Sequence, residues 1–166
     1  KKYQPYSLRK YQEGIALAVS SFRQNENSLL ARIKSTSRLL HELSYAEAKR
    51  KGFAGSLILN NRGYITEASN SNAFFIKDRF IFTPALACGC LDGITRRVIF
   101  DLAGNYNFKV EEGNFTLRDL YAAEEVFLTN SLAGIMPVAS LNGKIIGKGR
   151  CGRITRFFIE KYKLLF

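Results

Sequence analysis

The chain has 166 residues, of which 46% are hydrophobic and 23% charged, a composition that predicts one globular domain with a real core. The net charge is +11, but the basic residues are scattered and no nucleic-acid motif accompanies them, so nucleic-acid binding stays only an alternative. No apolar run approaches the roughly 18–20 residues that span a bilayer, and the start lacks a signal-peptide pattern, so we expect a cytoplasmic protein.

Potential metal ligands are few. The three cysteines are Cys88, Cys90 and Cys151, and His41 is the only histidine. An odd number of cysteines with a tight Cys-Gly-Cys spacing does not fit the usual zinc site. We therefore expect reduced thiols and no metal. We interpret His41, on a predicted helix, as structural or solvated rather than catalytic.

The first half of the chain predicts strands around one helix. Small and branched apolar residues indicate a buried strand over 13–22, followed by a polar loop over 23–28. Apolar residues at helical spacing predict a helix over 37–51, which ends at a glycine. A strand over 53–60 and a return strand over 64–67 should follow.

The second half predicts two hairpins and three helices. Residues 73–77 and 80–83 should pair around Asp78-Arg79, and 138–141 should pair with 144–146 around Asn142-Gly143. Thr116 and Asp119 should cap a short helix. The remaining predicted elements are a loop over 84–92, helices over 94–102, 116–123 and 154–165, and strands over 108–111 and 125–129. The pattern predicts one α+β domain with a mostly antiparallel β core.

Three separated groups could together hold a flat, phosphorylated, electron-accepting ring. Lys34, at the end of an apolar segment, could point inward and offer an amine for Schiff-base formation. Glu67 ends a strand after a glycine turn and could keep a proton on a pyridine nitrogen. Gly93-Ile94-Thr95 opens a helix, whose free N–H groups and Thr95 hydroxyl would bind a phosphate. Simple capping of that helix by Asp92 or Thr95 is the alternative.

Short side chains and a leucine complete the candidate site. The run after Glu67 includes Asn70 and would let the backbone approach the ring closely. Leu91 would pack on one ring face, unless it is ordinary core. Ser131, in the Thr-Asn-Ser sequence after a predicted strand, could be a plain turn residue.

The motifs resemble, in this order, those of the class IV aminotransferase family, which uses pyridoxal 5'-phosphate (PLP, fold type IV). They are Lys34, GYITE over 63–67, LDGITR over 91–96 and TNS over 129–131. The resemblance implies covalent attachment of PLP to a catalytic Lys34, a pyridine contact at Glu67, and phosphate contacts at residues 93–95 and Ser131. It also implies the larger domain of that fold, a pseudo-barrel with flanking helices, and a homodimer.

Two details resemble one member, 4-amino-4-deoxychorismate lyase. Leu39 lies where branched-chain aminotransferases have a tyrosine, and Arg38 precedes it. Asn130-Ser131 replaces the usual Gly-Thr or Ser-Thr pair of the transaminases. The resemblance thus favours a lyase that forms 4-aminobenzoate and pyruvate in folate biosynthesis. The alternative is a transaminase acting on D-amino or branched-chain amino acids. We expect residues 1–166 to be one PLP-binding domain from which the family's preceding small domain is absent.

Overall fold

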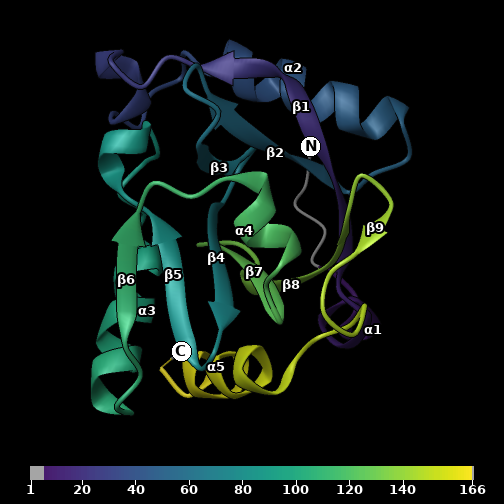
Figure 1. Cartoon of the computed structure of the whole chain (residues 1–166), viewed down its shortest axis with the longest axis vertical. Helices are drawn as coiled ribbons and strands as arrows, with labels where there is room; N and C mark the ends of the chain where they lie inside the picture. Colours follow the sequence, from purple (N-terminus) through teal and green to yellow (C-terminus); the bar gives the residue numbers. More distant parts are fainter. Residues whose placement is uncertain (1–5, 166) are drawn as a thin grey trace.

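The computed structural model describes residues 6–165, which form one curled, nine-stranded mixed sheet flanked by helices (Figure 1). The strand order is β3-β2-β1-β8-β7-β4-β5-β6, with β9 added to β8. The strands are β1 (Ile15–Gln24), β2 (Gly55–Asn60), β3 (Ile65–Ala68), β4 (Asn72–Lys77), β5 (Phe80–Pro84), β6 (Val110–Gly113), β7 (Glu125–Asn130), β8 (Gly134–Leu141) and β9 (Lys144–Ile145).

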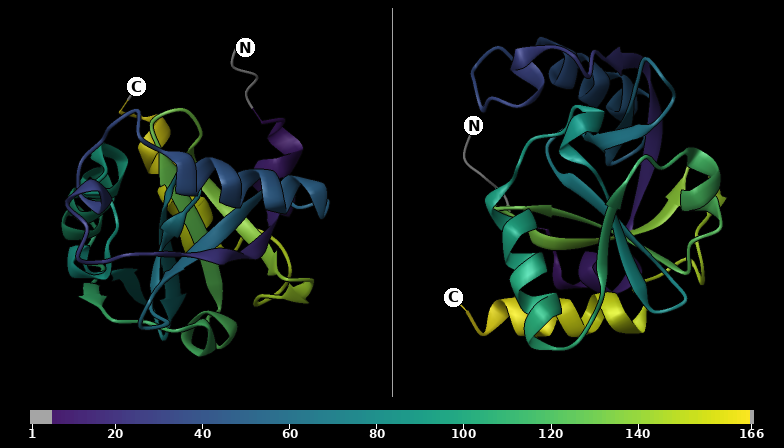
Figure 2. Two further views of the ribbon diagram at one scale, coloured as in Figure 1. Left: turned by 90° about the horizontal axis from the view of Figure 1, so that it is seen from above. Right: turned by 60° about the vertical axis from the view of Figure 1, so that its left-hand side comes forward.

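The helices connect and cover these strands. They are α1 (Leu8–Glu13), α2 (Leu39–Arg50), α3 (Ile94–Asn105), α4 (Leu117–Tyr121) and α5 (Arg153–Lys163), with 3-10 turns η1 (Leu29–Ala31) and η2 (Leu86–Cys88). Helix α2 packs on β1 and β2, whereas α3 and α5 pack on each other and on β7 (Figure 2). Within the part of the chain that the structure describes, no helix is long and apolar enough to cross a membrane.

Strand directions explain how the mixed sheet is connected. Strand β1 runs parallel to both of its neighbours, β2 and β8, and β5 runs parallel to β6. The other strand pairs are antiparallel, as the sequence predicted for most of the sheet. Helix α2 makes the crossover between β1 and β2, and α3 makes the one between β5 and β6, because parallel strands need a long connection.

Two apolar clusters form the core. One joins β1, β2, β3, β7 and β8 with α4, and includes Leu57, Leu128 and Leu120. The other lies beneath α3 and α5 and includes Phe74 and Phe127, whose rings stack at a centroid distance of 5.0 Å.

Both predicted hairpin turns are present. Asp78 and Arg79 have φ values of 50° and 66°, and Asn142 and Gly143 have values of 48° and 78°. Positive φ at both central residues is the geometry of a tight hairpin whose twist matches its strands. The capping of α4 is also confirmed, because Asp119 Oδ2 accepts hydrogen bonds from Thr116 N and Oγ1 at 2.7 and 2.8 Å.

Strands β1 and β8 are longer than predicted, and one short helix was not predicted. Strand β1 continues to Gln24, through part of the predicted loop, because Arg23 and Gln24 pair with β2. Strand β8 begins at Gly134 rather than at residue 138. The proline at position 137 concealed the first half of this strand in the sequence. Strand β1 pairs with β8 only from Val138 onward. Pro137 therefore has a ladder partner on one side only, where a missing N–H is tolerated. Helix α1 was not predicted, and none of its residues is buried.

Candidate functional site

The Glu67 carboxylate is held between helix α2 and the turn that precedes α3. Glu67 lies in β3, whose four residues are all buried. His41 Nε2 lies 2.9 Å from Glu67 Oε1, and the Leu91 backbone N–H donates to Oε2 at 3.1 Å. An ionised carboxylate in so little water needs such donors, since an unpaired buried charge is costly. The fold therefore supplies a satisfied, oriented anion at this place.

Asn72 joins Glu67 to the predicted phosphate-binding turn. Its Nδ2 donates to the Leu91 carbonyl oxygen at 2.7 Å and lies 3.5 Å from Glu67 Oε2. A Cβ atom added to Gly93 would come within 2.2 Å of Asn72 Oδ1. A side chain at position 93 would therefore have to displace the Asn72 amide, whereas the φ of −73° would suit any residue.

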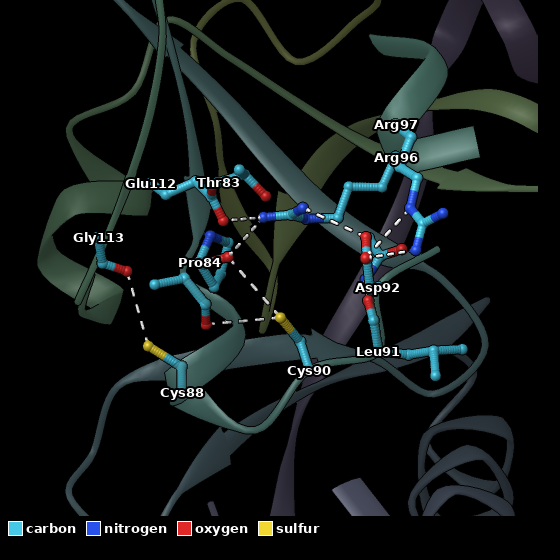
Figure 3. A network of polar contacts seen from close by, with 12 residues as sticks. Thr83, Pro84, Cys88, Cys90, Leu91, Asp92, Arg96, Arg97, Glu112 and Gly113 are labelled. Atoms are coloured by element: carbon cyan, nitrogen blue, oxygen red, sulfur yellow. Dashed lines mark hydrogen bonds and ion pairs between the residues drawn. The ribbon is translucent and has the colours of Figure 1, made fainter. Parts of the chain in front are cut away.

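A buried arginine fixes the same turn from its other side (Figure 3). Arg96 is 4% exposed. It hydrogen-bonds Glu112 of β6, donates to the Pro84 carbonyl oxygen at 3.4 Å, and lies 3.7 Å from Asp92 Oδ1. The Arg97 guanidinium also hydrogen-bonds Asp92 and, as the main cause, lowers the pKa of that carboxyl. The turn is thus fixed to β5 and β6.

The two thiols beside this turn are packed, not exposed. Cys88 Sγ lies 3.6 Å from the Gly113 carbonyl oxygen, and Cys90 Sγ lies 3.7 Å from that of Pro84 (Figure 3). All three cysteines are free. No cluster of three or more metal-binding side chains is present among residues 6–165.

Helix α3 begins without a side-chain cap. Its N-cap is Gly93, and no acidic residue lies in its first turn. By contrast, Asp119 caps α4, and the Glu125 carboxylate accepts hydrogen bonds from Ile154 N and Thr155 N at the start of α5. The alternative in which Asp92 or Thr95 caps α3 is therefore wrong, and Asp92 contacts Arg96 and Arg97 instead. The first-turn N–H groups of α3 are available to an anion.

Thr95 and Ser131 line one open cavity of about 520 Å³ beside this helix start, together with Ile94. Ser131 lies in the turn between β7 and β8. Asn130 shapes that turn, because its Oδ1 accepts hydrogen bonds from Leu132 N at 2.9 Å and Ala133 N at 2.7 Å. Two hydroxyls and a helix N-terminus are donors that suit a phosphate group.

Two other predicted site residues, Lys34 and Asn70, are exposed. Lys34 follows η1 and is exposed, whereas the sequence interpretation allowed its amine to point inward. Within residues 6–165, no hydrogen bond or ion pair connects it with Glu67 or Thr95. Asn70 is also exposed, and its Oδ1 accepts a hydrogen bond from Ser71 at 3.0 Å. Arg38 lies nearer to the Glu67 strand, since its Nη2 donates to the Ser69 carbonyl oxygen at 2.9 Å.

Two residues of this arrangement were not predicted from the sequence. His41 was interpreted as structural or solvated, yet it contacts the central carboxylate; a histidine on the helix that follows Lys34 was the only available signal. Asn72 was overlooked in favour of Asn70. The better signal was its position at the head of a strand, where the backbone fixes its direction.

The residues present fit a PLP molecule at two points. The uncapped start of α3, with Thr95 and Ser131, suits a phosphate, and the buried Glu67 carboxylate suits a protonated pyridine nitrogen. Leu91 is half-buried, and its backbone N–H contacts Glu67. The structure joins Glu67 to Leu91 by a hydrogen bond and places Gly93 against Asn72. Thr95 and Ser131 line a cavity whose lining does not include Glu67, and Lys34 is exposed.

Comparison with solved structures gives the same fold in PLP-family enzymes. The branched-chain amino acid aminotransferase of Escherichia coli superposes with a TM-score of 0.91 at 34% identity, covering 95% of this chain and 53% of that one. The T.th. enzyme of the same name, solved with pyridoxamine 5'-phosphate, gives 0.90 at 29% identity, covering 95% and 53%. A candidate 4-amino-4-deoxychorismate lyase of Legionella pneumophila gives 0.84 at 29% identity, covering 96% and 57%.

Sequence comparison agrees. The branched-chain-amino-acid aminotransferase of Pseudomonas aeruginosa is 37% identical over 153 residues, which are 91% of this chain and 50% of that protein. The chain therefore spans about half the length of the curated relatives that it matches. The family profile described as amino-transferase class IV matches residues 1–141. The predicted fold and family are confirmed: this chain belongs to the class IV aminotransferases.

Proposed function

We propose that this chain is the PLP-binding part of an aminotransferase that transfers the amino group of a branched-chain amino acid to a keto acid. The main support is the buried Glu67 carboxylate, fixed beside an uncapped helix start. The 37% identity to a branched-chain aminotransferase supports the substrate class. This substrate was the alternative of the sequence analysis, and the comparisons favour it over the lyase.

Each residue has a task in this proposal. PLP, when bound, supplies an electron-accepting ring. Glu67 holds a proton on the ring nitrogen, and Thr95, Ser131 and the first N–H groups of α3 hold the phosphate. Lys34 attaches the cofactor and, once released, moves a proton at the α-carbon of the amino acid. Lys34 is exposed in this chain. We place the smaller domain and the partner subunit of a homodimer over this exposed side, where they would cover Lys34.

The test is a cofactor and activity measurement on Lys34→Ala. Wild-type protein incubated with PLP should develop the visible absorbance of lysine-bound PLP, and the variant should not. When a keto acid is supplied as the amino acceptor, wild-type protein should form the corresponding keto acid from leucine, isoleucine or valine. Loss of the absorbance band in Lys34→Ala supports the proposal. A band that persists removes Lys34 from its role, and keto acid formed only from D-amino acids overturns the substrate class.

A lyase acting on 4-amino-4-deoxychorismate is the second candidate. It is favoured by Leu39, where branched-chain aminotransferases have tyrosine, and by Arg38, which reaches the Ser69 carbonyl oxygen beside Glu67. The likeness to the candidate lyase structure adds to this. In that reaction Lys34 would remove the proton from the ring carbon that bears nitrogen, and pyruvate would leave. Release of pyruvate and 4-aminobenzoate, without keto acid from amino acids, would favour this function.

A further inference from the structure

The chain's only histidine faces the carboxylate at the centre of the site. His41 Nε2 lies 2.9 Å from Glu67 Oε1, and the two side chains are 16% and 11% exposed. An ionised carboxylate only accepts hydrogen bonds, so Nε2 is the ring nitrogen that bears the hydrogen. The Leu91 N–H donates to the other oxygen at 3.1 Å. Glu67 is therefore held from opposite sides, by α2 and by the turn before α3.

This arrangement leaves one acceptor position open. A carboxylate has about four lone-pair sites. Oε2 accepts from Leu91 N–H and lies 3.5 Å from Asn72 Nδ2, whereas the only described donor to Oε1 is His41. The His41 contact fixes the rotation of the carboxylate about its last bond. It thereby determines where the remaining lone pair of Oε1 points.

We propose that His41 is a positioning residue that orients the Glu67 carboxylate toward the pyridine nitrogen of PLP. This inference rests on the proposed PLP binding. It extends to this chain the rule that a hydrogen-bonded partner behind a ligating group fixes its geometry and basicity. His41 does not touch the cofactor, so it acts only through Glu67.

A purely structural role would have a different signature. His41 also joins α2 to β3, so its loss could loosen the segment that bears Lys34 and Arg38. Such loosening would weaken the binding of every ligand of the site to a similar extent. If His41 is a positioning residue, its loss should weaken the binding only of ligands whose ring nitrogen can bond to Glu67. The two roles are therefore separated by a cofactor analogue without that nitrogen.

The experiment titrates the 166-residue chain with PLP and with 1-deaza-PLP, in which a C–H group replaces the ring nitrogen, and follows absorbance. The variants are His41→Leu, which removes the donor, His41→Gln, which retains an N–H at similar reach, and Glu42→Gln, an exposed control on the same helix. We expect His41→Leu to weaken PLP binding by about tenfold or more, and His41→Gln by less than about threefold. The analogue should bind wild type and His41→Leu alike.

NMR gives a second readout that does not need activity. Because the chain has one histidine, its imidazole carbon-bound protons give signals that need no assignment. Those signals should move in Glu67→Gln without any ligand. In the wild type they should move when PLP is added, and much less when the deaza analogue is added.

The possible results test three claims separately: the positioning role of His41, its contact with Glu67, and PLP binding. If His41→Leu weakens both compounds equally, or if folded His41→Gln loses PLP as His41→Leu does, the positioning role is overturned while PLP binding stands. If the imidazole signals ignore Glu67→Gln, the contact itself is refuted. If wild-type protein binds neither compound, the proposed function fails, and the role of His41 fails with it. Should His41→Leu not fold by circular dichroism, His41→Gln and the wild-type NMR titration still decide.

Discussion

Three hydrogen-bonded carboxylates of this chain are distinguished by their partners. Glu125 accepts hydrogen bonds from two backbone N–H groups of α5, and Glu47 pairs with Lys51. Glu67 has neither a helix N-terminus nor a lysine as partner; its donors are one imidazole, one backbone N–H and a more distant amide. Among the described residues, no lysine or arginine forms an ion pair with it. A buried anion held in this way is suited to a cationic ligand such as a protonated pyridine.

The cysteines give a prediction at the scale of single atoms. Burial raises the pKa of the Cys88 and Cys151 thiols and raises that of Cys90 to about 12. The thiolate is the reactive form, so iodoacetamide at pH 8 should leave the folded protein largely unmodified by mass spectrometry. The unfolded chain in urea should take up three labels, one for each cysteine. Rapid labelling of Cys90 in folded protein would contradict the packed environment beside Pro84 and Ala85.

At the scale of elements, helix α3 has a crowded glycine at its N-cap and an uncrowded one in its last turn. Gly93 abuts Asn72, whereas a Cβ added to Gly104 would find no atom within 4 Å. Gly93→Ala should therefore destabilise the protein by about 1–3 kcal/mol through overpacking. Gly104→Ala, in the last turn of the same helix, should stabilise it by up to about 0.5–1 kcal/mol.

Urea unfolding at pH 7 measures both changes. The Asn72→Ala background is the control, because removing the amide should relieve most of the Gly93→Ala penalty. Equal effects of Gly93→Ala in both backgrounds would show that Asn72 is not the obstacle.

The tie between α2 and β1 gives a pH prediction. Glu47 accepts hydrogen bonds from Lys51 Nζ at 2.8 Å and Ser21 N at 3.0 Å, and these lower its pKa from 4.5 to about 2. A folded-state pKa below the unfolded one stabilises the protein above about pH 4.5, and this contribution is lost as the pH falls toward 2. Glu47→Gln should cost about 1 kcal/mol at pH 7 and progressively less at lower pH. Urea titrations between pH 7 and pH 2.5 test this, with Glu42→Gln as an exposed control; a cost independent of pH would refute it.

At the scale of the whole molecule, local signals predicted the elements but not their arrangement. The Asp78-Arg79 and Asn142-Gly143 turns and the Thr116–Asp119 cap are encoded by neighbouring residues, so the sequence was sufficient for them. The parallel pairing of β1 with β2 and β8 depends on contacts more than 30 residues apart along the chain, and no local pattern reports such contacts.

In the candidate site, too, local motifs were predicted from the sequence and contacts between distant residues were not. Glu67, Gly93 and Thr95 lie in recognisable motifs and were predicted. The contact of His41 with Glu67 exists only because α2 packs against the sheet, which brings together residues 26 positions apart. Lys34 was expected to be buried because it follows an apolar segment. Leu29, Leu30 and Ile33 of that segment are themselves exposed, by 73%, 54% and 46%, so Lys34 has no apolar cover.

Ligand binding should stabilise the whole chain through the phosphate site. A ligand that binds only the folded state adds about 2.7 kcal/mol at one hundred times its dissociation constant. Pyridoxamine 5'-phosphate cannot form a Schiff base with Lys34, so it isolates the contributions of Glu67 and the phosphate donors. Thr95→Ala with Ser131→Ala should raise its dissociation constant about tenfold or more, because hydrogen bonds to a charged group are lost. Lys34→Ala should leave it nearly unchanged.

Thermal unfolding with increasing ligand measures these constants. Ser140→Ala, a half-buried hydroxyl of β8, is the matched control and should match wild type. Pyridoxamine, which lacks the phosphate, should stabilise the wild type and the double variant equally and weakly. If the double variant still gains as much stability from the phosphorylated ligand as wild type does, the phosphate is not bound between α3 and the β7–β8 turn. Equal stabilisation of wild type by the two ligands would show that the phosphate contributes nothing.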